Sequence, residues 1–192
     1  MNEPNPYEPP QGEPLPRIGE SALIDLNHQE VEAFVGRKAG YYLKKWPLAR
    51  GLTGRSTGFN WAAFFLSGLW LPYRKLYVVA TIFYVSMLIE SILEWVVFVG
   101  ILGKDDSPAS LSRVVGLVAA IICGALGNQW YLSHTRRAVA EVRSQGLPED
   151  AYLQALSRRG GTSIAAALGF FTLFIVALFA SLFLLDLLFA GG

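Results

Sequence analysis

Three long apolar stretches, residues 76–102, 114–131 and 164–189, constrain this chain more than any other feature. Each is close to the length of about 20 residues that an α-helix needs to cross the hydrocarbon core of a bilayer. At a rise of about 1.5 Å per residue, the first forms a helix about 40 Å long. Helices satisfy their backbone hydrogen bonds internally, as a bilayer requires. The sequence therefore predicts an all-α integral membrane protein with three transmembrane helices.

A shorter aromatic run, residues 59–75, comes directly before the first stretch. It holds too few apolar residues to cross a bilayer, and Pro72 ends its helical pattern just before Arg74 and Lys75. We expect a short re-entrant or interfacial helix in the cytoplasmic leaflet, with Trp61 facing lipid or a partner and the two cations holding its end. If the run crossed the membrane as a fourth span, Arg74 and Lys75 would lie outside, against the distribution of charge.

Positively charged residues predict the orientation. Of 16 Lys and Arg residues, nine precede residue 78 and five lie within residues 132–163, whereas residues 103–113 contain two. Cytoplasmic loops of membrane proteins carry an excess of Lys and Arg. We therefore expect a cytoplasmic N-terminus, three crossings and a C-terminus outside the membrane. Residues 132–163 are then a basic cytoplasmic helical loop.

Two further segments precede the aromatic run. Residues 1–26 hold six of the ten prolines, so we expect a disordered tail. Residues 27–46 have the pattern of an amphipathic helix, which begins with the capping-box spacing of Asn27 and Glu30 and ends near Trp46. Its apolar stripe either lies in the membrane interface or packs on protein, and the sequence leaves both open.

Glu90 and Glu94 are the most unusual residues of the first span. They lie four residues apart and share a helix face with Ser86. An ionised carboxylate at such a depth costs about 3 kcal/mol, and a second one a turn away adds repulsion. Two interpretations remain open: neutral carboxyl groups that bond across helices, within one chain or a dimer, or a relay for protons or cations.

The second span carries small or polar residues at every fourth position: Gly116, Ala120, Gly124 and Asn128. This spacing lets two helices approach closely, so we interpret the ridge as a packing surface. Arg158 and Arg159 come just before the third span, where a helix N-terminus and two guanidinium groups could hold a lipid phosphate. The alternative is an ordinary helix cap beside arginines that set the topology.

Several classes of function find no support. The only cysteine, Cys123, lies in an apolar run, and His28 and His134 are far apart, so we expect no metal site. We also expect no cofactor and assign no catalytic residue, because nucleophile and phosphate-loop motifs do not occur. The net charge of +1 argues against binding of nucleic acid. An enzyme that acts on lipid would need a residue pair that the sequence does not reveal.

Several motifs carry a resemblance to a known family. They are the YYLKKW sequence at 41–46, the NWAAFF block at 60–65, GLWL at 68–71, YRK at 73–75 and looser matches around 127–134 and 160–163. Over roughly residues 34–163 the chain resembles a bacterial membrane family catalogued as domain of unknown function 2628, with Pro72 where an apolar residue would be expected. The family has no established activity, so the resemblance implies a fold and an inner-membrane compartment but no reaction.

We therefore expect a non-enzymatic, multi-pass protein of the inner membrane. It would engage anionic lipid or a membrane protein partner, possible partners including a second copy of itself, from the cytoplasmic side. The candidate residues for this contact are Trp46, Trp61, Arg74, Lys75, Arg158 and Arg159. The alternative is an oligomeric protein that conducts protons or cations through Glu90 and Glu94.

Overall fold

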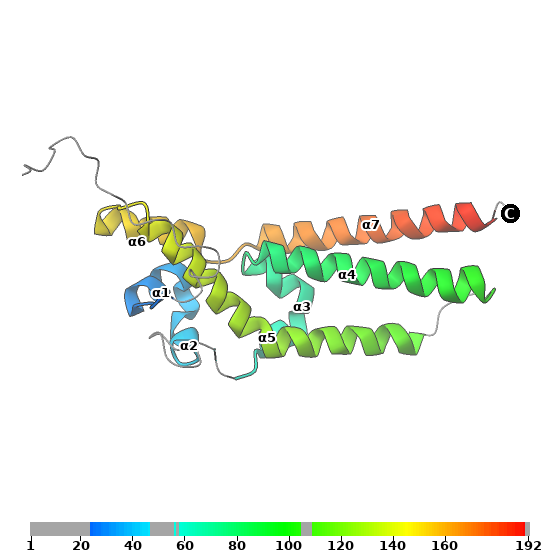
Figure 1. Ribbon diagram of the computed structural model, residues 1–192, viewed down its shortest axis with the longest axis horizontal. Helices are drawn as coiled ribbons and strands as arrows, with labels where there is room; N and C mark the ends of the chain where they lie inside the picture. Colours follow the sequence, from blue (N-terminus) through cyan, green and yellow to red (C-terminus); the bar gives the residue numbers. More distant parts are fainter. Residues whose placement is uncertain (1–23, 47–55, 57, 105–108, 191–192) are drawn as a thin grey trace, which may run out of the picture.

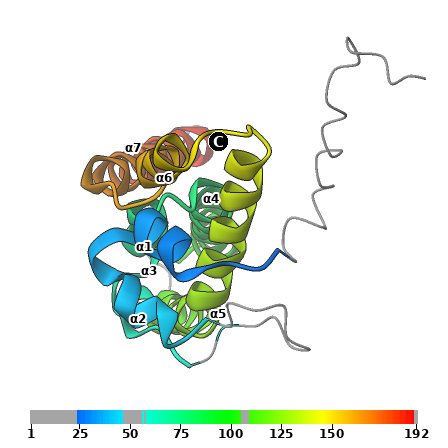
Figure 2. The same cartoon turned by 90° about the vertical axis from the view of Figure 1, so that its left-hand side faces the viewer.

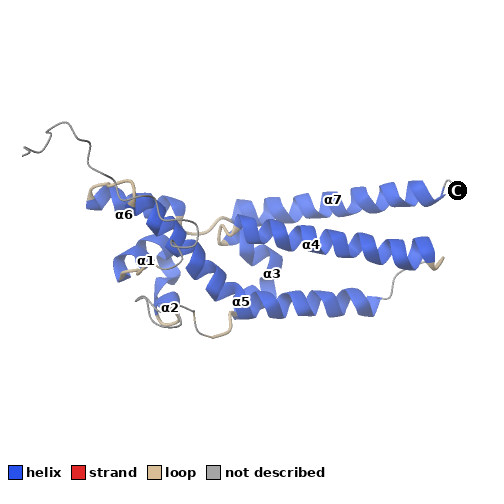
Figure 3. Ribbon diagram, in the orientation of Figure 1, coloured by secondary structure: helices blue, strands red, loops and turns tan. Residues whose placement is uncertain are grey.

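The computed structural model describes residues 24–46, 56, 58–104 and 109–190, and every regular element in this part of the chain is helical (Figures 1 and 3). The elements in order are α1 (His28–Val35), the 3-10 turn η2 (Gly36–Lys38), α2 (Ala39–Leu43), α3 (Trp61–Tyr73), α4 (Tyr77–Trp95), the π-helical turn η3 (Val96–Ile101), α5 (Ala109–Arg143), α6 (Glu149–Arg159) and α7 (Ile164–Ala190). The expected disordered tail lies outside the described residues, except for residues 24–26.

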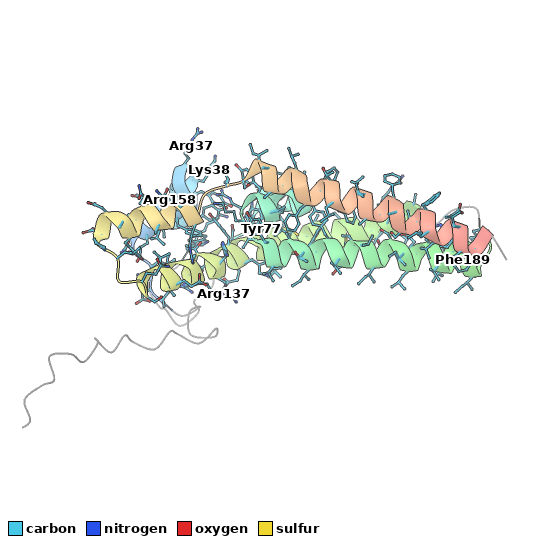
Figure 4. All side chains as sticks on the ribbon, turned by 90° about the horizontal axis from the view of Figure 1, so that it is seen from above. Arg37, Lys38, Tyr77, Arg137, Arg158 and Phe189 are labelled. Carbon is cyan, nitrogen blue, oxygen red and sulfur yellow. The ribbon has the colours of Figure 1, made fainter. Side chains whose placement is uncertain are left out.

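Three helices are long and apolar enough to cross a membrane: α4 with η3, α5, and the segment that contains α7. This confirms the predicted number of candidate spans. The 35 residues of α5 extend over about 52 Å, which exceeds a hydrocarbon core of about 30 Å. The last third of α5 therefore continues beyond the apolar part, among the basic residues. Figure 4 shows Arg137 and Arg158 beyond Tyr77 at one end of the molecule and Phe189 at the other; we call the former the basic end.

Helices α4 and α7 lie side by side along their length (Figure 1). Aromatic pairs join them at successive depths: Tyr84 contacts Phe174 with ring centroids 5.2 Å apart, and Trp95 contacts Phe189 at 5.3 Å. Gly100 allows this second contact, because a Cβ at this position would lie 2.9 Å from the ring of Phe189. The two helices run in the same direction and form one packed pair.

Helix α3 lies across the long helices near the basic end and packs against α4, α5 and α7 (Figure 1). The expected short helix is thus present, shorter at both ends than residues 59–75, and interrupted at Ser67, whose φ is 34°. Trp61 and Phe65 are 62% and 74% exposed, so one face of α3 is open within the described part of the chain.

The start of α3 is fixed to α5 by buried amides. Asn60 caps α3 by accepting a hydrogen bond from Ala63 N, and its Nδ2 donates to Asn128 Oδ1 at 2.9 Å. Asn60 N donates to Gly124 O at 2.8 Å. A side chain at Gly124 would collide with the ring of Phe59, so the small residue is what permits this approach.

The core of the basic end is formed by α1, α2, α6 and the end of α5 (Figure 2). The segment 27–46 is not one helix, because Gly36, with φ 70°, separates α1 from η2 and α2. Val31, Phe34 and Trp46 are at most 4% exposed. Of the two interpretations of this apolar stripe, the structure supports packing on protein.

A buried carboxylate joins three elements of this core. Glu30 is 2% exposed and forms the predicted capping box with Asn27. It also accepts hydrogen bonds from Arg143 Nε at 2.8 Å and Nη2 at 2.7 Å, and from the hydroxyl of Tyr152. The charge of Glu30 is thereby balanced, and α1, α5 and α6 are held together at one point.

Candidate functional site

The site begins at the turn between α3 and α4. Leu76 N donates to Leu71 O and Lys75 N to Pro72 O, which is the hydrogen-bond pattern of a Schellman motif. Lys75 occupies the left-handed position of this motif, with φ 59°, where glycine is usual. The strained backbone directs its side chain toward α6: Lys75 Nζ donates to Arg158 O at 3.2 Å and Arg159 O at 3.3 Å.

The opposite wall is one face of α5. Trp130, His134, Arg137 and Glu141 follow one another at intervals of three or four residues and so lie on one side of the helix. Because α5 extends beyond its apolar part, these side chains reach the level at which α4 begins. This face and the α3–α4 turn approach each other although they are some 60 residues apart in sequence.

Two adjoining cavities lie between these walls, with volumes of about 320 and 240 Å³. Both are lined by Lys75, Tyr77, His134 and Arg137, so they lie next to each other, and we treat them as two parts of one cleft. The larger part is completed by Leu76, Val78, Val79, Trp130 and Ser133, and the smaller part by Ala138, Glu141 and Arg159. We call this space the basic cleft. It has an apolar half along α4 and a charged half toward α6.

The charged half is positive overall. Arg159 forms an ion pair with Glu141 across the cleft. Arg137 is exposed and has no hydrogen-bond or ion-pair partner among the described residues. With three cations and one carboxylate, the net charge is about +2 when His134 is neutral. Burial, followed by the cation of Arg137, lowers the pKa of His134, which lies beyond the apolar part of α5. The charged half of the cleft therefore carries an excess of positive charge.

Two of the expected lipid-facing residues are buried instead. Trp46 is 4% and Arg74 6% exposed, so neither faces lipid. The guanidinium of Arg74 lies among aromatic rings, 5.2 Å from the centroid of Tyr42 and 5.1 Å from that of Tyr131. Aromatic faces attract a cation, and here they hold Arg74 within the core. Burial raises the pKa of Tyr42, so that its hydroxyl stays neutral beside this cation.

The start of α7, just after Arg158 and Arg159, is capped by a neighbouring serine. The hydroxyl of Ser163 accepts a hydrogen bond from Ala166 N and so caps this helix. Arg159 instead contributes to the basic cleft, whereas the side chain of Arg158 is exposed and only its carbonyl contacts Lys75.

Glu90, Glu94 and Ser86 line a second cavity of about 520 Å³ between α4 and α5. The hydroxyl of Ser112 on α5 donates to both carboxylate oxygens of Glu94 at 3.1 Å. The structure thus brings the predicted polar residues of the first span together and adds Ser112. The remaining walls are apolar.

Only half of the predicted small-residue ridge packs against another segment. Gly124 and Asn128 are buried against the start of α3, whereas Gly116 is exposed with no atom near its Cβ position, and Ala120 is half-buried. The segment that approaches this half of the ridge is the start of α3.

Sequence reasoning missed Arg137 and Glu141 as parts of a site. Their spacing with Trp130 and His134 on one helix face was the available signal. This spacing indicates a cleft only when the α3–α4 turn lies opposite, and that contact does not follow from the spacing itself. No group of three or more potential metal ligands occurs in the described part of the chain.

Comparison with known proteins gives one result. A family model described as "Protein of unknown function (DUF2628)" matches residues 29–137, which cover α1 to most of α5 and more than half of the chain. The match starts slightly before the expected region and ends before residues 160–163, so the glycine motif there lies outside it. No curated protein and no solved structure matches the chain. The chain belongs to this family, DUF2628.

Proposed function

We propose that this protein is a non-enzymatic, multi-pass membrane protein that binds an anionic phospholipid in the basic cleft. One observation carries the proposal: the apolar and the charged half of the cleft adjoin each other, because they share four lining residues. A phospholipid has a matching arrangement, because its apolar acyl chains are joined directly to a charged headgroup. Val78 and Val79 would contact the chain, and Arg137 the headgroup.

The position of the cleft along the molecule supports this ligand. Tyr77 and Trp130 lie where the apolar part of α4 begins, and such residues are enriched at the boundary between lipid and water. The cations lie on the side of this boundary that faces the basic end (Figure 4). A lipid whose chains lie among the spans would therefore present its phosphate at the level of these cations.

We place the basic end on the cytoplasmic side of a bacterial inner membrane, with the N-terminus inside and the C-terminus outside. The excess of Lys and Arg at this end supports the assignment. Cysteine accessibility in intact cells tests it, in a Cys123→Ala background. A membrane-impermeant maleimide should label Lys104→Cys and leave Arg158→Cys unlabelled. The opposite pattern would reverse the orientation.

The strain at Lys75 offers a variant that separates binding from folding. Lys75→Gly relieves a left-handed backbone that costs about 1 kcal/mol for a residue with a side chain. It loses contacts to the end of α6 that contribute about 0.5–1 kcal/mol. The two effects nearly cancel, so the fold should be retained while one cation of the cleft is removed.

The test is lipid binding by the full-length protein in nanodiscs. Native mass spectrometry would count anionic lipids retained from a phosphatidylcholine background that contains phosphatidylglycerol and phosphatidic acid. Arg137→Gln and Lys75→Gly should lose retention. Arg113→Gln, the same kind of change at the other end of α5, should not. Equal retention by all four proteins, or no preference for anionic lipid, would reject the function.

A second candidate is conduction of protons or cations by an oligomer. The observation that favours it is the cavity lined by both Glu90 and Glu94. In liposomes the protein should then carry a flux that a Glu90→Gln, Glu94→Gln variant abolishes. Flux equal to that of empty vesicles would reject conduction and leave the lipid proposal untouched.

A further inference from the structure

The charged half of the basic cleft contains two cations that form no ion pair with a carboxylate of the described residues. Arg159 is paired with Glu141, which leaves Lys75 and Arg137. Lys75 uses two hydrogen bonds on the carbonyls of α6, and an ammonium group has three donors, so one remains. Arg137 lines both parts of the cleft, and its guanidinium has no hydrogen-bond or ion-pair partner among the described residues.

We propose that the basic cleft selects a lipid whose headgroup is a phosphate monoester, over lipids whose phosphate is a diester. This rests on the proposed function and specifies its ligand. A monoester carries a charge of about −1.5 to −2 at neutral pH and three terminal oxygens. Two oxygens fit the fork of Arg137 and the third fits the free donor of Lys75, so both charges are neutralised. A diester has one charge and two such oxygens, and it leaves one cation unpaired.

Glu141, which lines the cleft, contributes to this preference for a monoester. It holds Arg159 in an ion pair and so keeps a third cation from the ligand. Its own negative charge also faces the space that the headgroup would occupy. In Glu141→Gln, Arg159 becomes available, so affinity for every anionic lipid should rise and the preference for the monoester should narrow.

His134 provides a local readout. It faces Phe34 of α1 and lies near Lys75 of the α3–α4 turn and Arg137 and Glu141 of its own helix. Its pKa is lowered, and an anion that neutralises the two cations would raise it again. The chain has two histidines, so nuclear magnetic resonance of the imidazole nitrogens resolves both. His134 should respond to bound lipid, and His28 should not.

The experiment compares phosphatidic acid with phosphatidylglycerol, each in phosphatidylcholine nanodiscs that hold the full-length protein. Wild-type protein should bind phosphatidic acid about tenfold more tightly, as one additional charge-assisted contact implies. Arg137→Lys keeps the charge but loses the fork, and should bind both lipids with little preference. Arg113→Gln should behave as the wild type, and the pKa of His134 should rise more with phosphatidic acid.

Three outcomes would contradict the inference, and they differ in what they leave standing. Equal affinity for the two anionic lipids would overturn the monoester preference alone and leave the proposed function intact. Loss of any preference for anionic lipid would overturn both. Displacement of phosphatidic acid by an equal concentration of soluble glycerol phosphate would show that the cleft binds a free phosphate ester, and would overturn a lipid ligand.

Discussion

Replacement of Glu30 by glutamine should loosen the basic end, because Glu30 is the acceptor at which α1, α5 and α6 meet. The side chain is 2% exposed and accepts two hydrogen bonds from Arg143, one from Tyr152 and one from Asn27 N. Glutamine has nearly the same shape but only one acceptor oxygen. In the better of its two orientations it can donate to the hydroxyl of Tyr152, yet it loses one bond to Arg143 and the charge that strengthens the other.

The magnitude follows from these contacts. A hydrogen bond to a charged group contributes about 1.5–3 kcal/mol, so the loss of one and the weakening of another cost about 2–3 kcal/mol. The value stays below the cost of breaking a fully buried pair, since Arg143 is 42% exposed and its charge can be hydrated. For a chain of 192 residues, 1 kcal/mol shifts the melting temperature by about 2–4 °C, so the melting temperature should fall by roughly 4–12 °C.

Thermal unfolding in detergent, with limited proteolysis of the basic end, measures the effect. Glu32→Gln is the matched control, because Glu32 lies on the same helix and is exposed. The converse variant, Arg143→Gln, should be at least as damaging, since it leaves a buried carboxylate without its cation. The assigned role of this pair is wrong if Glu30→Gln and Glu32→Gln have the same melting temperature. It is also wrong if Arg143→Gln lowers the melting temperature much less than Glu30→Gln does.

Three further predictions concern packing and pH. Gly160→Ala should abolish stable docking of α6 on α1, because its Cβ would lie 1.9 Å from the backbone oxygen of Phe34, whereas Gly169→Ala, with no atom nearby, should leave the melting temperature unchanged or slightly higher. Asn128→Ala leaves buried polar groups of the α3 start unpaired and should destabilise by about 2–4 kcal/mol, read as a lower melting temperature and faster proteolysis within residues 47–60. Burial and the hydrogen bond to the buried carboxylate of Glu30 raise the pKa of Tyr152 from about 10 to about 12. This tyrosine therefore stabilises the fold below pH 10 and loses its contribution between about pH 10 and 12. The melting temperature of Tyr152→Phe should lack the decrease that the wild type shows over this range.

The features that follow from local rules could be predicted from the sequence. Hydropathy and length are sufficient for the three long helices, and the Asn27–Glu30 spacing for the start of α1. Pro148 and Gly160 cap the two ends of α6, and both are local signals, since proline suits the start of a helix and glycine its end. Each of these depends on residues within a few turns of one another.

The environment of a stripe or a cation could not be predicted in this way. The apolar stripe that ends at Trp46 has the same helical period whether lipid or protein covers it. Arg74 and Lys75 are neighbours in sequence, yet Arg74 lies in an aromatic core and Lys75 in a cleft. Their different positions depend on the left-handed turn at Lys75. This turn could not be predicted, because glycine is the residue that usually marks a left-handed position.

The placement of α3 explains why two cavities of different chemistry occur along the same pair of helices. Helix α3 packs on α4 near Phe83, where the Cβ position of Gly68 on α3 lies 2.8 Å from the Phe83 ring. On α5, it packs at Gly124 and Gly127. The basic cleft lies on one side of these contacts, and the cavity with the two glutamates on the other. Helix α3 therefore acts as a spacer that holds α4 and α5 apart and leaves room on each side.

This arrangement gives the two candidate functions a common structural cause and a way to distinguish them. A larger residue at Gly127 would move α3 away from α5, since its Cβ position is already 2.9 Å from that of Ala63. Both cavities would change shape together. Lipid retention that falls in Gly127→Val but not in the Glu90→Gln, Glu94→Gln variant would assign binding to the basic cleft, because only the first change reaches its walls through α3.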